Sequence, residues 1–318
     1  MERIEVTLRG IDAALPIVRE VAIHTPTVPF HGTLDREVWL KLENLQRLGA
    51  FKIRGVWNRL SRLTETERRR GVATISSGNH GLALAWAAKR LGLRCVVRVP
   101  EGAVGRKVDA IRAHGAEVLP ISRRELVLAH EEETWRSWPE VFIHPFAHPA
   151  TIAGQGTLGW ELVDDVPDVR TVLVPVGGGG LAAGIGTAVK GLLPNAKVFG
   201  VQAEGAAPLP VALRTHAAHR IDQPRTIADG IGIALILPNM ADLLHRVLDG
   251  CLVVSDAEIL AAMRTLALEA RVVAEPAGAA AFAAWVQYRT SLEPPVVLVI
   301  SGGNPTLNLL SQVVAPTE

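Results

Sequence analysis

Short runs of β-branched residues alternate along the chain with alanine- and leucine-rich segments that have helical spacing. Three strand-like runs are each followed by a helix-like segment: residues 72–75 precede 81–91, residues 94–99 precede 105–114, and residues 171–176 precede 181–193. Further strand-like runs lie at residues 197–202 and 296–300. Apolar strands that alternate with helices are typical of sheets covered on both faces. The pattern therefore predicts an α/β fold built on mostly parallel sheet.

Two polar segments divide this pattern. Residues 64–70 and 144–149 are predicted to be solvated connections. The block between them is about half the length of an ordinary domain and has its own strand–helix alternation. We therefore predict a small domain at residues 69–148, inserted into a large domain formed by residues 1–68 and 149–318.

The composition narrows the functional class. The chain has 318 residues, 48% of them apolar, and a formal charge of +1, so neither nucleic acid nor an anionic membrane surface is an expected partner. Two cysteines are too few for a disulfide framework or a zinc cluster. The first residues lack an apolar signal core, and no apolar run is long enough to cross a bilayer. We expect a soluble cytoplasmic protein.

Four consecutive glycines, Gly177, Gly178, Gly179 and Gly180, join the predicted strand 171–176 to the helix that follows it. Glycines let backbone approach an anion, and a helix N-terminus favours a phosphate. A tight turn is the alternative, although it rarely needs four glycines. The segment also satisfies the dinucleotide pattern, with Glu204 closing a strand just over twenty residues later, so the sequence predicts phosphate binding without fixing the ligand.

A second loop carries several polar groups at once. Ser76, Ser77, Gly78, Asn79 and His80 lie between a predicted strand and an apolar helix. Helix capping explains one of these residues, whereas the set together suits a carboxylate at a positive helix end.

A third turn of this kind, residues 301–304, follows the last predicted strand. Ligands bind at the carboxyl ends of strands in open α/β sheets, so the three turns can share one crevice.

Lys52 is the candidate for covalent chemistry. It lies between apolar neighbours in a chain that has six lysines and 27 arginines. A desolvated lysine can lose its proton and form a Schiff base with a carbonyl compound, which an arginine cannot do. The alternative is an ordinary solvated lysine before a helix.

Seven segments together resemble the pyridoxal-phosphate enzymes of fold type II, specifically the serine/threonine dehydratase and serine racemase group. They occur in the family's order and are Phe51-Lys52-Ile53-Arg54-Gly55, Ser76-Ser77-Gly78-Asn79-His80-Gly81, Ala153-Gly154-Gln155-Gly156-Thr157, Val176-Gly177-Gly178-Gly179-Gly180-Leu181, Thr226-Ile227-Ala228-Asp229-Gly230, Glu275-Pro276 and Ser301-Gly302-Gly303-Asn304. This resemblance displaces the dinucleotide interpretation. It implies a tryptophan-synthase-β-like architecture of two open, mostly parallel twisted sheets with flanking helices, and pyridoxal 5'-phosphate as cofactor.

The resemblance also implies roles for individual residues. Lys52 would hold the cofactor and exchange the substrate Cα proton, with Phe51 beside the ring, Asn79 at its phenolic oxygen and Ser301 at its nitrogen. The cofactor phosphate would lie on the four glycines and Leu181, and Gly230 and Glu275 would also border the cofactor. The substrate carboxylate would lie among Ser76, Ser77, Gly78 and His80.

Three functions follow as hypotheses. The first is the deamination, by dehydration, of a β-hydroxy amino acid such as L-threonine or L-serine to a 2-oxo acid and ammonia. The alternative is an amino-acid racemase, in which Lys52 and Ser77 act as bases on opposite faces of the substrate. The third is a non-catalytic phosphate- or nucleotide-binding module. The resemblance further implies a homodimer.

The family's divalent-cation site is incomplete in this sequence. Glu204 matches a carboxylate ligand, but the next two ligand positions fall on Pro208 and Pro210, and a proline offers a carbonyl oxygen without charge. We therefore expect no tight Mg²⁺ or Ca²⁺ site, and Glu204 is equally well a solvated carboxylate. The chain ends soon after Asn304, so we expect no regulatory extension and no feedback control.

Overall fold

The computed structural model describes residues 3–31, 37–103 and 105–315 and contains two main sheets. The larger sheet has, in spatial order, strands β1 (Thr27–Pro29), β2 (Val38–Lys41), β12 (Val296–Val299), β7 (Thr171–Pro175), β8 (Lys197–Ala203) and β11 (Gly250–Val254). The smaller sheet has the order β5 (Glu117–Ile121), β4 (Cys95–Pro100), β3 (Val72–Ile75) and β6 (Val141–Phe142). A short hairpin pairs β9 (His219–Arg220) with β10 (Leu235–Ile236).

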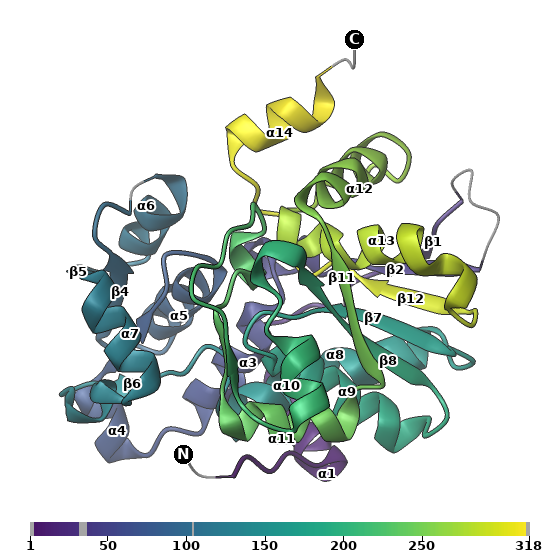
Figure 1. The fold of residues 1–318 in the computed structure, drawn as a ribbon. Coiled ribbons are helices and arrows are strands. Elements are labelled where there is room, and N and C mark those ends of the chain that lie inside the picture. Colours follow the sequence, from purple (N-terminus) through teal and green to yellow (C-terminus); the bar gives the residue numbers. More distant parts are fainter. Residues whose placement is uncertain (1–2, 32–36, 104, 316–318) are drawn as a thin grey trace.

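Helices cover both sheets, and the smaller sheet with its helices forms the blue part of Figure 1, beside the larger sheet, whose first two strands are purple and whose other strands run from teal to yellow. The α-helices are α1 (Leu8–Asp12), α2 (Leu15–Arg19), α3 (Lys52–Ser61), α4 (Glu65–Arg70), α5 (Asn79–Arg90), α6 (Arg106–Ala113), α7 (Arg123–Glu131), α8 (Pro149–Asp165), α9 (Gly180–Leu192), α10 (Leu209–Thr215), α11 (Pro238–Val247), α12 (Asp256–Leu268), α13 (Pro276–Tyr288) and α14 (Leu307–Val314). Among the described residues, no helix is both long enough and apolar enough to cross a membrane.

Pairing between the described strands is parallel throughout the smaller sheet, and in the larger sheet only β1 runs antiparallel to its neighbour β2. Every residue of β3, β7 and β12 is buried, as expected for strands with helices on both faces. The predicted α/β fold with mostly parallel sheets is therefore confirmed.

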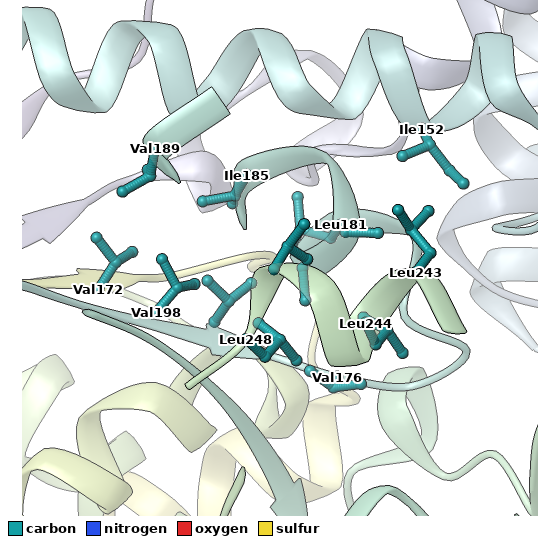
Figure 2. Packing of buried hydrophobic residues seen from close by; sticks show 14 of the residues in the cluster. Ile152, Val172, Val176, Leu181, Ile185, Val189, Val198, Leu243, Leu244 and Leu248 are labelled. Atoms are coloured by element: carbon teal, nitrogen blue, oxygen red, sulfur yellow. The ribbon is translucent and has the colours of Figure 1, made fainter. Parts of the chain in front are cut away.

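One apolar core lies between the larger sheet and helices α8, α9 and α11. Figure 2 shows Val172 of β7 and Val198 of β8 facing Ile185 and Val189 of α9, with side chains of α11 completing the layer. Each fully buried side chain of this kind contributes roughly 1.5–3 kcal/mol relative to exposure. This layer fixes the turn between β7 and α9, which is where the four glycines lie.

Of the two predicted solvated connections, residues 64–70 are mostly exposed, as expected, whereas residues 144–149 are partly buried. Residues 64–70 form an exposed helix, α4, whose first turn is closed by a capping box between Thr64 and Glu67. Residues 144–149 are not a solvated segment, because the side chains of His144 and Phe146 are buried. The histidine is held inside because its Nδ1 accepts hydrogen bonds from the backbone N–H groups of Phe146 and Ala147.

The strands of the smaller sheet lie between residues 72 and 142, and those of the larger sheet lie on either side of that range in the sequence. This placement supports an inserted small domain, while the boundaries at 68/69 and 148/149 stay predictions. The outer limits of the predicted large domain, Met1 and Glu318, lie outside the described residues.

Candidate active site

One cavity of about 470 Å³ lies where strands of both sheets end. Its wall includes residues that follow β3, β7 and β12, so the carboxyl ends of strands from the two sheets face the same space. The predicted site residues that line it are Phe51, Lys52, Ser76, Ser77, Gly78, Asn79, His80, Gly177, Gly178, Gly179, Gly180, Leu181, Gly230, Glu275 and Ser301. The structure therefore brings together every predicted site residue except Glu204, and the roles of these residues stay predictions.

Lys52 begins helix α3 and extends into this cavity. Its Nζ lies 4.8 Å from the centre of the Phe51 ring and donates to the Pro145 carbonyl oxygen at 3.4 Å. Desolvation lowers the pKa of Lys52 to about 8, although the negative charge of Glu275 acts in the opposite direction. An appreciable fraction of the amine is thus uncharged near neutral pH, as a nucleophile toward a carbonyl requires.

His80 lies in the first turn of α5, with its imidazole buried beside the cavity. Its Nε2 lies 3.1 Å from the Ile143 carbonyl oxygen, which can only accept, so Nε2 carries the hydrogen. Burial, and then the charge of Lys52, lower the pKa of His80 to about 3. The ring is therefore neutral, and Nδ1, which has no hydrogen-bond partner among the described residues, is an acceptor. A substrate carboxylate would be bound by other donors of the loop.

The glycine loop is shaped by both backbone conformation and packing. Gly179 has φ +95°, a conformation that side chains rarely adopt, and it is the N-cap of α9. A Cβ on Gly178 would overlap the ring of Phe146, which packs against the loop. The Ala183 N–H donates to the Gly179 carbonyl oxygen and closes the first turn of α9, so the amides that precede Ala183 at the helix N-terminus are suited to an anion.

A hydrogen-bonded chain of polar side chains crosses the cavity wall. Asn79 Nδ2 donates to Glu275 Oε1 at 2.7 Å, and Asn79 Oδ1 accepts from Asn304 Nδ2 at 3.0 Å. Burial raises the pKa of Glu275, and nearby Asp229 adds to this effect, while Lys107 acts against it. Ser301 is buried, and its carbonyl accepts from the Phe51 N–H at 3.2 Å, which ties the end of β12 to the start of α3.

Behind Lys52, helix α3 is anchored by a buried cluster of charges. Arg54 is fully buried, and its guanidinium donates two hydrogen bonds to the carboxylate of Glu43 and two to the carboxylate of Glu161, all at 2.7–2.8 Å. The buried amine of Lys41 joins this cluster at 3.2 Å from Glu161 and 2.9 Å from Asp165. Burial alone would raise the pKa of Glu43, but the charge and hydrogen bonds of Arg54 outweigh burial and lower it.

Several residues in or beside the site were not singled out from the sequence, among them Lys107 and Asn304. Lys107 lines the cavity from α6, and the contact of Asn304 with Asn79 was not foreseen. The scarcity of lysine, which drew attention to Lys52, could have singled out Lys107 as well. Phe146 also lines the cavity, and the sequence marks it, with residues 144–149, as a candidate to face the β-substituent of a bound substrate, with packing as the alternative.

Glu204 does not line this cavity. It is exposed in a short 3-10 helix, Glu204–Ala206, that follows β8. Within the described ranges, no three His, Cys, Asp or Glu side chains are grouped so that they could hold a metal ion. The expectation that no tight Mg²⁺ or Ca²⁺ site exists stays a prediction.

A buried lysine of lowered pKa, a glycine loop at a helix N-terminus and a two-sheet α/β fold define a class of enzyme that holds a phosphorylated carbonyl cofactor. Residues 18–302 match the family model described as "Pyridoxal-phosphate dependent enzyme". The chain belongs to this family, and its cofactor is pyridoxal 5'-phosphate.

Individual relatives agree with this assignment. The chain is 37% identical to L-threonine ammonia-lyase of Thermotoga maritima, over 97% of this chain and 78% of the relative. It is similar in structure to a threonine deaminase of T.th., with a TM-score of 0.86 and 36% identity over 95% of this chain and 99% of the other. It is also similar to maize serine racemase, with a TM-score of 0.88 and 29% identity over 96% of each chain.

Proposed function

We propose that this chain deaminates a β-hydroxy amino acid, L-threonine or L-serine, to a 2-oxo acid and ammonia. The observation that carries the proposal is the similarity to L-threonine ammonia-lyase over nearly the whole chain. For L-threonine the net products are 2-oxobutanoate and ammonia, because the water lost from Cα and Cβ is replaced by the water that releases the nitrogen. The geometry of the cavity supports this chemistry.

The residues present fit the cofactor. The amides at the start of α9 suit its phosphate, and the amine of Lys52 suits its aldehyde. Two buried atoms without hydrogen-bond partners in the described part of the chain, His80 Nδ1 and Glu275 Oε2, border the same cavity and indicate that it is built to receive a polar ligand. When bound, pyridoxal phosphate supplies an aldehyde for the amine and a conjugated ring that takes up electrons from the substrate Cα.

The side chains of this protein then divide the remaining tasks. Lys52, with its pKa lowered to about 8, takes the proton from the substrate Cα as a general base. Ser76, Ser77 and the N–H groups at the start of α5 bind the carboxylate at the positive end of that helix. Ser301 offers a neutral hydroxyl to the cofactor ring, so that no carboxylate holds a proton on the ring nitrogen.

The direct test is release of 2-oxo acid by the purified protein from L-threonine, L-serine and larger β-hydroxy amino acids. We expect turnover of L-threonine or L-serine, and in Lys52→Ala a loss of at least about 1000-fold, because both the nucleophile and the base are removed. Borohydride reduction followed by peptide mass spectrometry should place the cofactor on Lys52. A cofactor-loaded protein that releases no 2-oxo acid from any of these substrates would contradict the proposal.

Racemisation is the second candidate, because Ser77 lines the same cavity as Lys52. Ser77→Ala should abolish interconversion of L- and D-serine while formation of 2-oxo acid persists. Loss of both activities together would count against a scheme with a base on each face. A homodimer and a cytoplasmic location also stay predictions, and sedimentation of the purified protein would test the dimer.

A further inference from the structure

Lys107 belongs to a helix beside the smaller sheet, and its side chain contacts residues on the larger sheet's side of the cavity. It lies in the first turn of α6, and its Nζ is 3.5 Å from Asp229 Oδ2 and 3.7 Å from Glu275 Oε2. Asp229 lies in the 3-10 helix Asp229–Ile231, and Glu275 is the N-cap of α13. The Lys107 side chain is 25% exposed, so its charge is partly shielded from solvent.

Glu275 is the buried member of this group. Its side chain is 4% exposed, and among the described residues Oε2 has no hydrogen-bond partner. A buried carboxylate without its full set of partners is costly unless a cation lies close to it. The groups that face it are Lys107 from α6, Asp229, Asn79 from α5, the Asn304 N–H, and Lys52 from α3.

Glu275 in turn fixes the orientation of Asn79. The carboxylate only accepts, so the Asn79 amide nitrogen faces Glu275 at 2.7 Å, and its oxygen accepts from Asn304 at 3.0 Å. Asn304 is itself held because its Nδ2 also donates to the Leu48 carbonyl oxygen at 2.8 Å. The second hydrogen of the Asn79 amide nitrogen is thereby available as a donor to a ligand in the cavity.

We propose, on the basis of the proposed function, that Lys107 is a positioning residue that keeps Glu275 ionised and so holds Asn79 as a donor to the bound cofactor. Lys107 reaches Glu275 only while α6 lies against the larger sheet's side of the cavity. The contact therefore couples the placement of the smaller sheet to the hydrogen bond that the cofactor receives. A proton on Glu275 would make Oε1 or Oε2 a competing donor and weaken the hold on Asn79.

The test is a pH titration of the visible absorption of the cofactor-loaded enzyme without substrate. In Lys107→Met the acid-side transition should move to higher pH by about one unit, the size of effect expected for an opposite charge within about 4–6 Å. Lys107→Arg, which keeps the charge, should stay within a few tenths of a unit of the wild type. Lys89→Met, a matched change at an exposed lysine of α5, should leave the transition unchanged.

Glu275→Gln shows whether Lys107 acts through Glu275. This variant should lose the acid-side transition, and adding Lys107→Met to it should have no further effect. The proposal is overturned if Lys107→Met titrates like Lys89→Met, or if the shift persists in the double variant. If Lys107→Met does not retain the cofactor, an unchanged transition in Glu275→Gln alone also overturns it.

The kinetic readout separates this inference from the proposed function. With L-threonine, the acid limb of kcat/KM should move by the same pH interval in Lys107→Met. If no variant turns over a β-hydroxy amino acid but the spectral shift occurs, the proposed function fails and the role of Lys107 stands. If turnover is observed and the spectra and pH profiles coincide, the role of Lys107 fails alone.

Discussion

Two clusters of buried charge flank Lys52, and they differ in how completely their members are paired. Around Arg54, both oxygens of Glu43 and both oxygens of Glu161 accept hydrogen bonds, and Thr25 adds one to Glu43 at 2.6 Å. Around Glu275, one oxygen accepts from Asn79 at 2.7 Å, and the other lies 3.7 Å from the amine of Lys107.

This difference distinguishes the Arg54 cluster, which stabilises the fold, from the Glu275 cluster, which belongs to the candidate active site. A fully paired cluster fixes helix α3 in place and has no unused acceptor for a ligand. An incompletely paired cluster retains part of its desolvation cost, which a ligand or a nearby cation can offset. The pKa values follow the same division, since the pKa of Glu43 is lowered and that of Glu275 is raised.

The largest expected effect is on the paired cluster. Arg54→Met leaves two buried carboxylates without their cation, so we expect it to lower the free energy of unfolding by about 3–5 kcal/mol. Urea denaturation of the purified protein measures this loss. The control is Arg170→Met in the exposed pair with Glu293, which should cost less than about 1 kcal/mol. Equal losses in the two variants would remove the distinction between buried and exposed pairs.

Glu275→Gln should have a smaller effect on stability, within about 1 kcal/mol of the wild type at neutral pH. The amide keeps an acceptor for Asn79 while it removes a buried charge that is incompletely paired. The same urea denaturation, run beside Arg54→Met, checks this. A loss as large as that of Arg54→Met would mean that Glu275 belongs to the scaffold.

The two carboxylates should also give opposite responses to acid. Glu275 has a raised pKa in the folded protein, so the folded state binds more protons and stability rises as the pH falls from that pKa toward 4.5. Glu43 has a lowered pKa, so its contribution is lost as the pH falls below 4.5 toward the folded value. When the free energy of unfolding is measured across this pH range, Glu275→Gln should lack the rise on acidification, and Glu43→Gln should lack the loss at lower pH. Two variants with parallel curves would contradict the assignment.

The smallest expected effect is a difference in chemical reactivity between two lysines, Lys52 and Lys41. Lys52 has a pKa of about 8 and lines the cavity, whereas Lys41 is buried among Glu161 and Asp165. Reductive labelling of the cofactor-free protein with pyridoxal should therefore modify Lys52 first, at a rate that rises as the pH passes through about 8. Peptide mass spectrometry at short times measures the order. Early modification of Lys41 would show that the paired cluster is more open than the structure indicates.

Much of this arrangement could be predicted from the sequence because it depends on local rules. Strands apolar throughout, glycines before a helix and polar loops at strand ends placed Gly179, Ser77 and Ser301 around one cavity. Spatial neighbours from distant segments could not be found in this way. Nothing local in the sequence pairs Arg54 with Glu161, or Lys107 with Glu275, because those contacts depend on how α6, α8 and α13 pack.

Burial of single side chains was also not predictable from composition. Residues 144–149 look polar, yet His144 is inside because its ring nitrogen satisfies two backbone N–H groups of the same turn. That local bond turns Phe146 toward the glycine loop, where it fills the space that side chains at Gly178 and Gly180 would need. A sequence pattern records residue types, whereas this outcome depends on a hydrogen bond that only the folded turn provides.

The position of β12 has a consequence for the order in which the protein is made. This strand, near the end of the chain, lies between β2 and β7 and is the link that joins the first two strands to the rest of the larger sheet. During synthesis on the ribosome, β1 and β2 therefore cannot pair with the rest of the larger sheet until residues 296–299 have emerged. Since Ser301 and Asn304 follow that strand, a nascent polypeptide acquires its complete catalytic pocket only after residues 301–304 have been synthesised.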